Sequence, residues 1–265
     1  MITVEQLQAG IILPIDKPRQ WSSFQVVNKV KAIVRNTYGL KKFKIGHAGT
    51  LDPLATGLLL VCIGKATKTI PDLQDGDKVY SGTMVFGATT PCFDLERAID
   101  RYYPYEHITH PLLAEAAKGL TGTIMQVPPM FSAVKIDGMR AYRYARTDDP
   151  TVVIQPKPVQ VYSFEISDFR PGNGERITEE KERETEKSEG PFYKNPQGTV
   201  PPHLPQADFR IHCGKGTYIR SLARDLGLEL GSGAFLSALR REQVGEYAVA
   251  DALQIDQVEQ FLTVD

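Results

Sequence analysis

The stretch KIGHAGTLDPLATGLLLVCIGKAT, residues 44–67, carries one acidic side chain, Asp52, between glycines and a continuous apolar run. The preceding segment 17–51 contains eight basic residues and no acid. A carboxylate in such surroundings can act as a nucleophile or a base. It can equally accept backbone N–H bonds in a structural turn, and Pro53 would fix that turn. The tripeptide Asp-Pro-Leu alone leaves both roles open.

Other chemistries have weaker signals. The glycines do not follow the spacings of phosphate-binding or dinucleotide-binding loops. The five histidines lack metal-ligand spacing, and no serine lies in a GxSxG elbow. The three cysteines, which are distant and without CxxC spacing, argue against a zinc site or a disulfide framework. We therefore expect no metal and no cofactor; the cysteines are Cys62, Cys92 and Cys213.

Charge is unevenly distributed along the 265 residues, although the formal net charge is only −1. A second basic set lies in segment 126–146, together with aromatic residues, and acids gather in segment 175–189. Such separation suits a polyanion such as RNA, or it forms an ordinary solvated face. The chain has neither an apolar run that would cross a bilayer nor a signal-peptide pattern, so we expect a cytoplasmic protein without membrane contact.

Hydrophobic periodicity predicts the elements that position these residues. A short strand begins at Ile11, and a helix begins at Ser22 or Ser23 and ends at Gly39. The helix would bury Phe24, Val27, Val30 and Val34. The sequence further predicts strands over 58–63, 78–90 and 158–169, a helix over 111–120, and a strand, turn and helix over 207–230.

Two segments read as loops. Residues 126–146, with a Pro-Pro break, are expected to form a mobile loop that ends in a helical turn, or an ordinary surface connection. Residues 170–206 have too little apolar content to bury a face, so we expect a flexible charged excursion at a hairpin tip.

Strand 158–169 would bury Tyr162, Phe164 and Ile166 in alternation. Strands and helices without a regular βαβ rhythm predict an α+β fold with a mixed sheet.

Five blocks carry a resemblance to a known family. The chain contains DKPRQWSS, GHAGTLDPLATGLLLVCIGKATK, DKVYSGTMVFGATTPCFD, VPPMFSAVKIDGMRAYRYAR and CGKGTYIRSLARDLG, in that order. In sequence and order these blocks resemble those of the TruB family of tRNA pseudouridine synthases. The resemblance extends from Ile11 to about Leu253, except for residues 170–206. It implies the pseudouridine synthase catalytic fold, with a central, mainly antiparallel mixed sheet flanked by helices and loops.

The resemblance also implies the chemistry. Asp52 would be the catalytic carboxylate that helps break the C1′–N1 bond of a uridine before the uracil rejoins through C5. Its point of attack (C6, C1′ or the C2′ proton) stays open. Tyr80 would stack on the target base, Arg220 would pair with Asp52 and keep it ionised, and Tyr218 would shape the same pocket.

Further positions follow by similarity. His47 would lie near the backbone of the flipped nucleotide, Lys68 close to the site, and Leu239 in an apolar pocket, although structural roles fit these residues nearly as well. Lys17 and Lys135 would contact phosphate. Segment 125–146, with Arg140 and Arg143, would close over the RNA.

The implied substrate is the T-loop uridine of tRNA, at position 55. Residues 1–253 would form one catalytic domain, and 254–265 a short tail that is long enough for one helix, without a separate RNA-binding PUA domain. We expect a monomer that requires no protein partner. Two other readings remain: an RNA-binding folding helper that has kept the scaffold, and a hydrolase that uses Asp52, although the motif lacks a partner acid.

Overall fold

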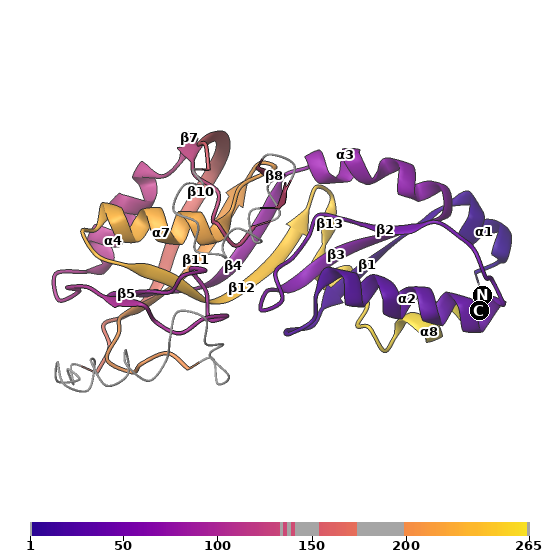
Figure 1. Cartoon of the computed structure of the whole chain (residues 1–265), viewed down its shortest axis with the longest axis horizontal. Helices are drawn as coiled ribbons and strands as arrows, with labels where there is room; N and C mark the ends of the chain where they lie inside the picture. The colour runs from indigo at the N-terminus through magenta and orange to yellow at the C-terminus, as the bar shows by residue number, and fades with distance from the viewer. Residues whose placement is uncertain (1, 133–134, 137–138, 141–153, 174–198, 264–265) are drawn as a thin grey trace. The chain divides into compact units, whose positions relative to one another are not determined.

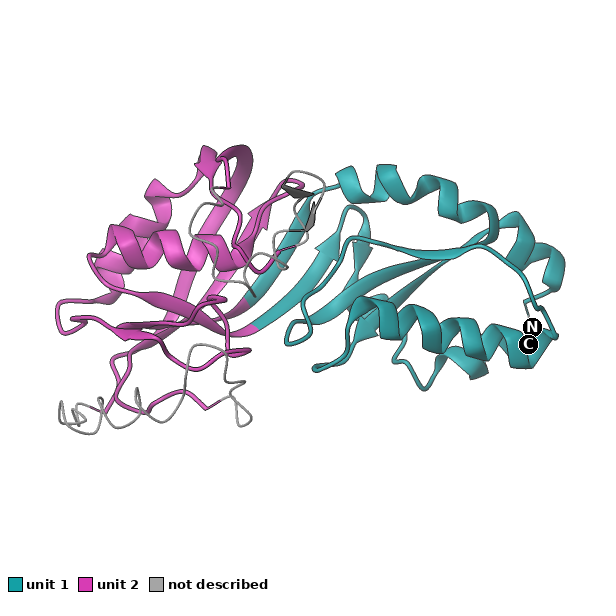
Figure 2. Ribbon diagram, in the orientation of Figure 1, with its two compact units in different colours: residues 1–81, 239–265 teal, residues 82–238 magenta. Residues whose placement is uncertain are grey.

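A computed structural model describes residues 2–132, 135–136, 139–140, 154–173 and 199–263. The chain divides into two compact units (Figure 2). Residues 1–81 and 239–265 form the first unit, and residues 82–238 form the second. Two strands, β4 (Lys78–Phe86) and β12 (Ala234–Val244), have residues in both units.

The first unit is built around β3 (Thr56–Ile63), whose last seven residues are buried. It pairs antiparallel with β1 (Ile11–Lys17) and with β2 (Ile45–Ala48), and parallel with β12 at Thr56 and Gly57. A short strand β13 (Tyr247–Ala248) pairs with β12. The helices of this unit are α1 (Val4–Ala9), α2 (Ser23–Tyr38), α3 (Ile70–Asp75) and α8 (Val258–Thr263), as Figure 1 shows. Two 3-10 helices, η1 (Gly64–Thr69) and η2 (Val249–Asp251), belong to it as well.

Helix α2 confirms the predicted bounds. Ser22 caps it through a capping box with Gln25, and Gly39 ends it in the left-handed conformation. The predicted apolar face is correct for its valines but wrong for Phe24, which is 67% exposed. Phe24 lies in the first turn, on the side away from the core. The buried face is instead formed by Val26, Val27, Val30, Ile33 and Val34.

The C-terminal segment contributes to the core of the same unit. Val258 and Leu262 of α8 are fully buried in a cluster with residues of α2, β1 and β3. Leu253 pairs with Ile15 of β1, and its N–H donates to the carbonyl of Pro14. Helix α8 thus packs on the rest of the unit through its apolar side.

The second unit contains a sheet in the order β4, β11 (Gln206–Cys213), β10 (Lys157–Arg170) and β7 (Gly122–Gln126). β10 pairs antiparallel with both of its neighbours. The unit also has helices α4 (His110–Gly119) and α7 (Ile219–Glu229), and the two-stranded sheets β5 (Ala88–Thr89) with β6 (Arg101–Tyr102) and β8 (Lys135–Ile136) with β9 (Met139–Arg140).

Strand β10 departs from the predicted alternation. Val159, Val161 and Phe164 are buried, whereas Tyr162 is 54% exposed. A register shift between Val161 and Ser163 explains the difference. An extra residue in one strand moves the following side chains to the opposite face of the sheet, so the strand cannot keep a period of two across it.

The predictions for β11 and α7 agree with the structure. Phe209, Ile211 and Cys213 alternate as buried residues of β11, and α7 buries the expected face. β10 and β11 form the two sides of the hairpin that residues 170–206 connect; residues 174–198 of that connection lie outside the described residues. The expected helical turn at the end of segment 126–146 also lies outside them.

These pairings confirm the α+β class with a mixed sheet, since antiparallel pairs dominate and β3 with β12 is parallel. In the part of the chain that the structure describes, every helix is too short or too polar to span a bilayer.

Candidate active site

Asp52 begins a tight turn that connects β2 to β3 in the first unit. The N–H of Ala55 donates to the carbonyl of Asp52 at 3.1 Å, and Pro53 occupies the second position of this turn. Proline suits that position because its ring fixes the backbone angle that the turn needs. The side chain of Asp52 is half-buried. The carboxylate is therefore presented on a backbone that the local sequence restrains.

The residues before Asp52 are held by Ser23, at the start of α2. The N–H of Leu51 donates to Ser23 Oγ at 2.9 Å, and this hydroxyl donates to the Leu51 carbonyl at 3.2 Å. Ser23 is 2% exposed, so both bonds are shielded from water. The sequence indicated Ser23 only as a cap, whereas Ser22 caps the helix and Ser23 fixes the Asp52 turn.

Lys17 holds the other side of the turn. Its ammonium group donates to the carbonyls of Pro18 at 3.0 Å, Trp21 at 2.6 Å and Pro53 at 3.3 Å. Its side chain is fully buried, which contradicts the expected phosphate contact, because a phosphate could reach it only by displacing these partners. Burial lowers the pKa of Lys17 to about 8, and the negative charge of Asp52 opposes that shift.

Arg241 connects β12 to both ends of the turn. It is 1% exposed, and its guanidinium donates to the carbonyl of Leu58 at 2.7 Å and to that of Gly49 at 3.1 Å. Gly57 lies against the backbone of Arg241, and a Cβ there would be 2.3 Å from the Arg241 carbonyl oxygen. Gly57 also has a φ of +98°, so it allows both the close approach and the conformation.

A neighbouring ion pair fixes β12 to β1. Arg240 contacts Asp16 through both oxygens, at 3.0 and 2.7 Å, in the bidentate geometry that arginine favours. The arginine is 36% exposed and the aspartate 14%. The pair is thus partly screened, and its main effect here is to set the position of the strand that carries Arg241.

His47 lies on β2, two residues before Gly49. Its Nδ1 is buried without a hydrogen-bond partner among the described residues. Burial lowers the pKa of His47, the Gly49 backbone partly opposes this, and the positive charge of Arg241 lowers it further. The ring is therefore neutral near pH 7. A neutral imidazole can donate or accept one hydrogen bond without adding charge beside the turn.

Two other predicted site residues belong to the same unit. Tyr80 is half-buried on β4, next to Ser81, whose hydroxyl donates to Glu242 of β12. Leu239 is half-buried on β12, and its carbonyl accepts a bond from Thr56 Oγ1 at 3.5 Å. The structure thus brings the backbone of Leu239 to the C-terminal end of the segment that connects β2 to β3 and contains Asp52.

Lys68 is not where the sequence led us to expect it. It lies on η1, which follows the last residue of β3, whereas Asp52 precedes the first. Eight residues of extended strand separate the two ends by about 23 Å. The expected closeness of Lys68 to Asp52 is therefore contradicted; Lys68 lines a separate pocket with other lysines.

Arg220 belongs to the second unit, on the first turn of α7. It is 5% exposed, and its guanidinium donates to the carbonyl of Cys92 at 3.0 Å and to that of Phe131 at 2.7 Å. Its Nε lies 3.7 Å from a carboxylate oxygen of Asp94. Arg220 thus joins α7 to two loops of its own unit, and its pairing with Asp52 stays a prediction.

Tyr218 precedes α7 and is held by a buried glutamine. Its N–H donates to Gln126 Oε1 at 2.8 Å, and Gln126 Nε2 donates back to its carbonyl at 3.1 Å. The backbones of Lys135 and Arg140 are register partners in the β8–β9 hairpin. Arg143 lies outside the described residues. The proposed RNA contacts of these three basic residues stay predictions.

Sequence reasoning missed the residues that support the turn. Arg241 had no role in the predictions made from the sequence, and Gln126 was predicted at the start of a loop. A buried arginine has no local signature, because its partners here are backbone carbonyls nearly two hundred residues away. The signal in the sequence was a pair of glycines, Gly49 and Gly57, one on each side of the turn, since glycine marks close backbone approach.

Comparison with known proteins identifies the class of this chain. Residues 35–190 match the model described as TruB family pseudouridylate synthase (N terminal domain), and residues 220–264 match the tRNA pseudouridylate synthase B C-terminal domain. Both models describe pseudouridylate synthases, the class of enzyme that the sheet and the aspartate turn also fit. The chain belongs to the TruB family.

The curated relatives match over three quarters of their length or more. A protein from Flavobacterium johnsoniae named tRNA pseudouridine synthase B is 46% identical over 98% of this chain and 100% of its own. One of the same name from Phocaeicola vulgatus is 42% identical over 96% of this chain and 93% of its own. One from Thermobifida fusca is 38% identical and is covered over 76% of its length.

Solved structures agree at the level of the fold. A chain in the crystal structure of a Cbf5-Nop10-Gar1 complex has a TM-score of 0.63 and 24% identity, and 96% of this chain is covered. A chain in an H/ACA RNP bound to a substrate RNA containing 2′-deoxyuridine has a TM-score of 0.60 and 22% identity, with 98% covered. The present chain spans about half the length of these two. The fold is that of pseudouridine synthases.

Proposed function

We propose that this protein isomerises uridine to pseudouridine in the T-loop of tRNA, at position 55, with Asp52 as the catalytic carboxylate. Membership of the TruB family supports the reaction class, and the names of the full-length relatives support tRNA as the substrate. One observation of the structure carries the role of Asp52. Its turn is held by buried side chains from three elements, as a catalytic group requires.

This support has a chemical consequence. Lys17, Ser23 and Arg241 all bind backbone carbonyls or N–H groups of the connection, so these contacts fix the backbone from which the Asp52 side chain projects. A carboxylate held on a restrained backbone can act as the nucleophile or the base that the reaction needs. A fixed position matters because a misplacement of about 1 Å can cost about a hundredfold in rate.

The remaining roles complete the proposal. Tyr80 stacks on the flipped base, Tyr218 and Leu239 line its pocket, and His47 contacts the flipped nucleotide. Arg220 pairs with Asp52 during the reaction, and segment 125–146 closes over the RNA with Lys135, Arg140 and Arg143. Aromatic stacking and charge-assisted phosphate contacts are the usual means of holding an unstacked nucleotide.

We also propose that the protein works as a monomer in the cytoplasm, without a protein partner, and that residues 1–253 form the catalytic domain. Residues 254–265 then serve as a tail that completes the core of the first unit, since Val258 and Leu262 are fully buried there.

The proposal is tested by site mapping. Purified protein is incubated with an unmodified tRNA transcript, and pseudouridine is located by chemical modification and primer extension. The wild type should convert the T-loop uridine alone, and Asp52→Asn should convert none while still binding the transcript. Conversion at other sites would contradict the substrate assignment. If neither protein converts any uridine but both bind tightly, the RNA-folding helper would replace the enzyme.

A further inference from the structure

A pocket in the first unit lies at the opposite end of β3 from Asp52. It has a volume of about 330 Å³ and is lined by residues of α1, of the segment 40–44, and of β3 and η1. Because β3 extends over eight residues, the pocket lies about 23 Å from the Asp52 turn. No residue that has a role in the proposed function lines this pocket. Lys68, which the sequence predicted to lie near the site, does line it.

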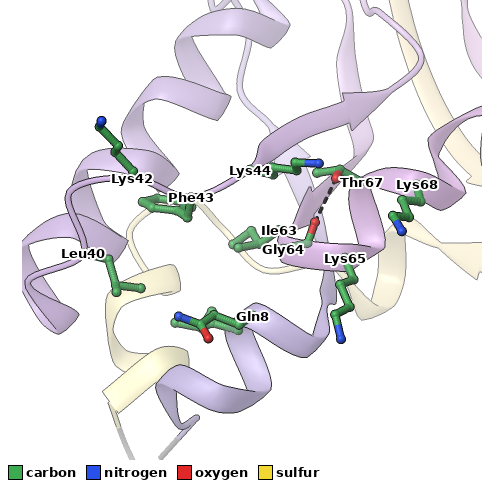
Figure 3. A pocket seen from close by; sticks show the side chains of 11 residues that line it. Gln8, Leu40, Lys42, Phe43, Lys44, Ile63, Gly64, Lys65, Thr67 and Lys68 are labelled. Carbon is green, nitrogen blue, oxygen red and sulfur yellow. Dashed lines mark hydrogen bonds between the residues drawn. The ribbon is translucent and has the colours of Figure 1, made fainter.

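The pocket is lined by positively charged and apolar side chains. Four lysines, Lys42, Lys44, Lys65 and Lys68, contribute to it, and all four are exposed. No acidic residue contributes, and in the described part of the chain none of the four ammonium groups has an ion-pair partner. Figure 3 shows these lysines around an apolar centre formed by Leu40, Phe43 and Ile63.

The frame of the pocket is fixed by backbone contacts. The N–H of Gly64 donates to the carbonyl of Lys44 at 2.9 Å, which holds segment 40–44 against η1. Thr67 Oγ1 donates to the carbonyl of Gly64 at 2.8 Å, the bond drawn in Figure 3. Gly64 has a φ of +65°, and a Cβ there would be 2.1 Å from the carbonyl oxygen of Leu7. The pocket is thus pre-formed, and binding costs little ordering of the chain.

We propose that this pocket binds an unpaired nucleotide of the tRNA outside the T stem-loop. The apolar centre with Phe43 offers a surface for one base, and its volume suits a group of that size. The lysines take the flanking phosphates, and their number favours a polyanion over a neutral ligand. Segment 40–44 contributes two of the lysines and η1 the other two, so two neighbouring segments bring positive charge to the pocket, as a nucleic-acid strand requires.

This inference rests on the proposed function for the identity of the RNA, and its test does not require turnover. The double variant Lys42→Ala/Lys65→Ala removes two positive charges from the pocket. Lys118→Ala/Lys157→Ala, two exposed lysines of the second unit, is the matched control. Dissociation constants are measured for full-length tRNA and for the isolated T stem-loop between 50 and 200 mM salt.

For full-length tRNA, the pocket variant should bind about tenfold more weakly, with a salt dependence shallower by about 1.4 to 1.8 in log–log slope. The control variant should change neither value. On the isolated stem-loop, the pocket variant should bind and turn over as the wild type does. An unchanged salt slope with full-length tRNA would overturn the proposal, and so would an equal loss on the stem-loop.

Phe43→Leu separates stacking from charge, because it keeps apolar volume and removes the aromatic face. Affinity for full-length tRNA should fall about fivefold or more, with an unchanged salt slope. Adenosine monophosphate at 1 mM should not displace the tRNA; displacement at micromolar concentration would instead make this a site for free nucleotides. If Asp52→Asn retained turnover, the proposed mechanism would fail while these binding results could still hold.

Discussion

Replacement of Arg241 by methionine tests how the Asp52 turn is held. Methionine keeps much of the aliphatic volume and removes two hydrogen bonds from a charged donor, those to Leu58 and Gly49. Each such bond contributes about 1.5 to 3 kcal/mol. The loss is partly offset, because burying a cation carries a desolvation cost of several kcal/mol. We expect the free energy of unfolding to fall by about 2 to 4 kcal/mol.

The effect on the reaction follows from the Gly49 contact. Without it, the connection that carries Asp52 loses one of its supports. We expect the single-turnover rate to fall about tenfold to a hundredfold, as for a misplaced catalytic group, while the dissociation constant for tRNA stays within about threefold. Unfolding is followed in urea, and turnover is measured on the isolated T stem-loop below the unfolding transition.

Arg210→Met is the matched control. Arg210 is exposed on β11, so its replacement should change the free energy of unfolding by less than about 1 kcal/mol and leave the rate unchanged. If Arg241→Met were no more destabilising than Arg210→Met, the buried arginine would not support the turn. A large loss of stability with an unchanged rate in the folded protein would show that Arg241 stabilises the fold without fixing the position of Asp52.

Three further predictions concern the same supports. The pKa of Lys17 in the folded protein, about 8, lies below its value of about 10.4 in the unfolded chain, so the folded state binds fewer protons between these values. The stability of the wild type relative to Lys17→Met should therefore rise from pH 8 to 10 in urea titrations, and a flat or falling difference would contradict the burial. Ser23→Ala leaves the buried N–H and carbonyl of Leu51 without a partner, and should cost about 1 to 3 kcal/mol and slow turnover; unaltered stability would refute the contact. Gln126→Leu removes both bonds to the backbone of Tyr218 and should cost about 1 to 3 kcal/mol, a loss that hydrogen exchange would locate at the start of α7.

The local elements could be read from the sequence where one signal dominates. Helix α2 has a capping serine, a regular apolar period and a terminal glycine, and its bounds were predicted correctly. The exposure of Phe24 and Tyr162 was not predicted correctly, because the exposure of a side chain depends on which elements pack against its own element. For Tyr162 it also depends on a register shift that the strand's composition does not encode.

The candidate site likewise contains residues to which the sequence pointed and residues to which it did not. The motif around Asp52 left a catalytic and a structural role open, and the prediction of a catalytic role came from the resemblance of five sequence blocks to the TruB family. The role of Lys17 was predicted wrongly and that of Arg241 was not predicted, because a lysine or arginine in sequence indicates a solvated charge. These two side chains instead bind backbone carbonyls in the interior. Such partners are set by tertiary packing, so only coordinates can reveal them.

The central claim is that one carboxylate, Asp52, performs the isomerisation. Its most direct test is tritium release from tRNA labelled at C5 of uridine, measured under single-turnover conditions, since rejoining through C5 displaces that atom. The wild type should release the label from the T-loop position, and Asp52→Asn should release none above background, with tRNA affinity within about threefold of the wild type because the substitution removes no cation that contacts phosphate. Release by Asp52→Asn at a rate within tenfold of the wild type would contradict the account.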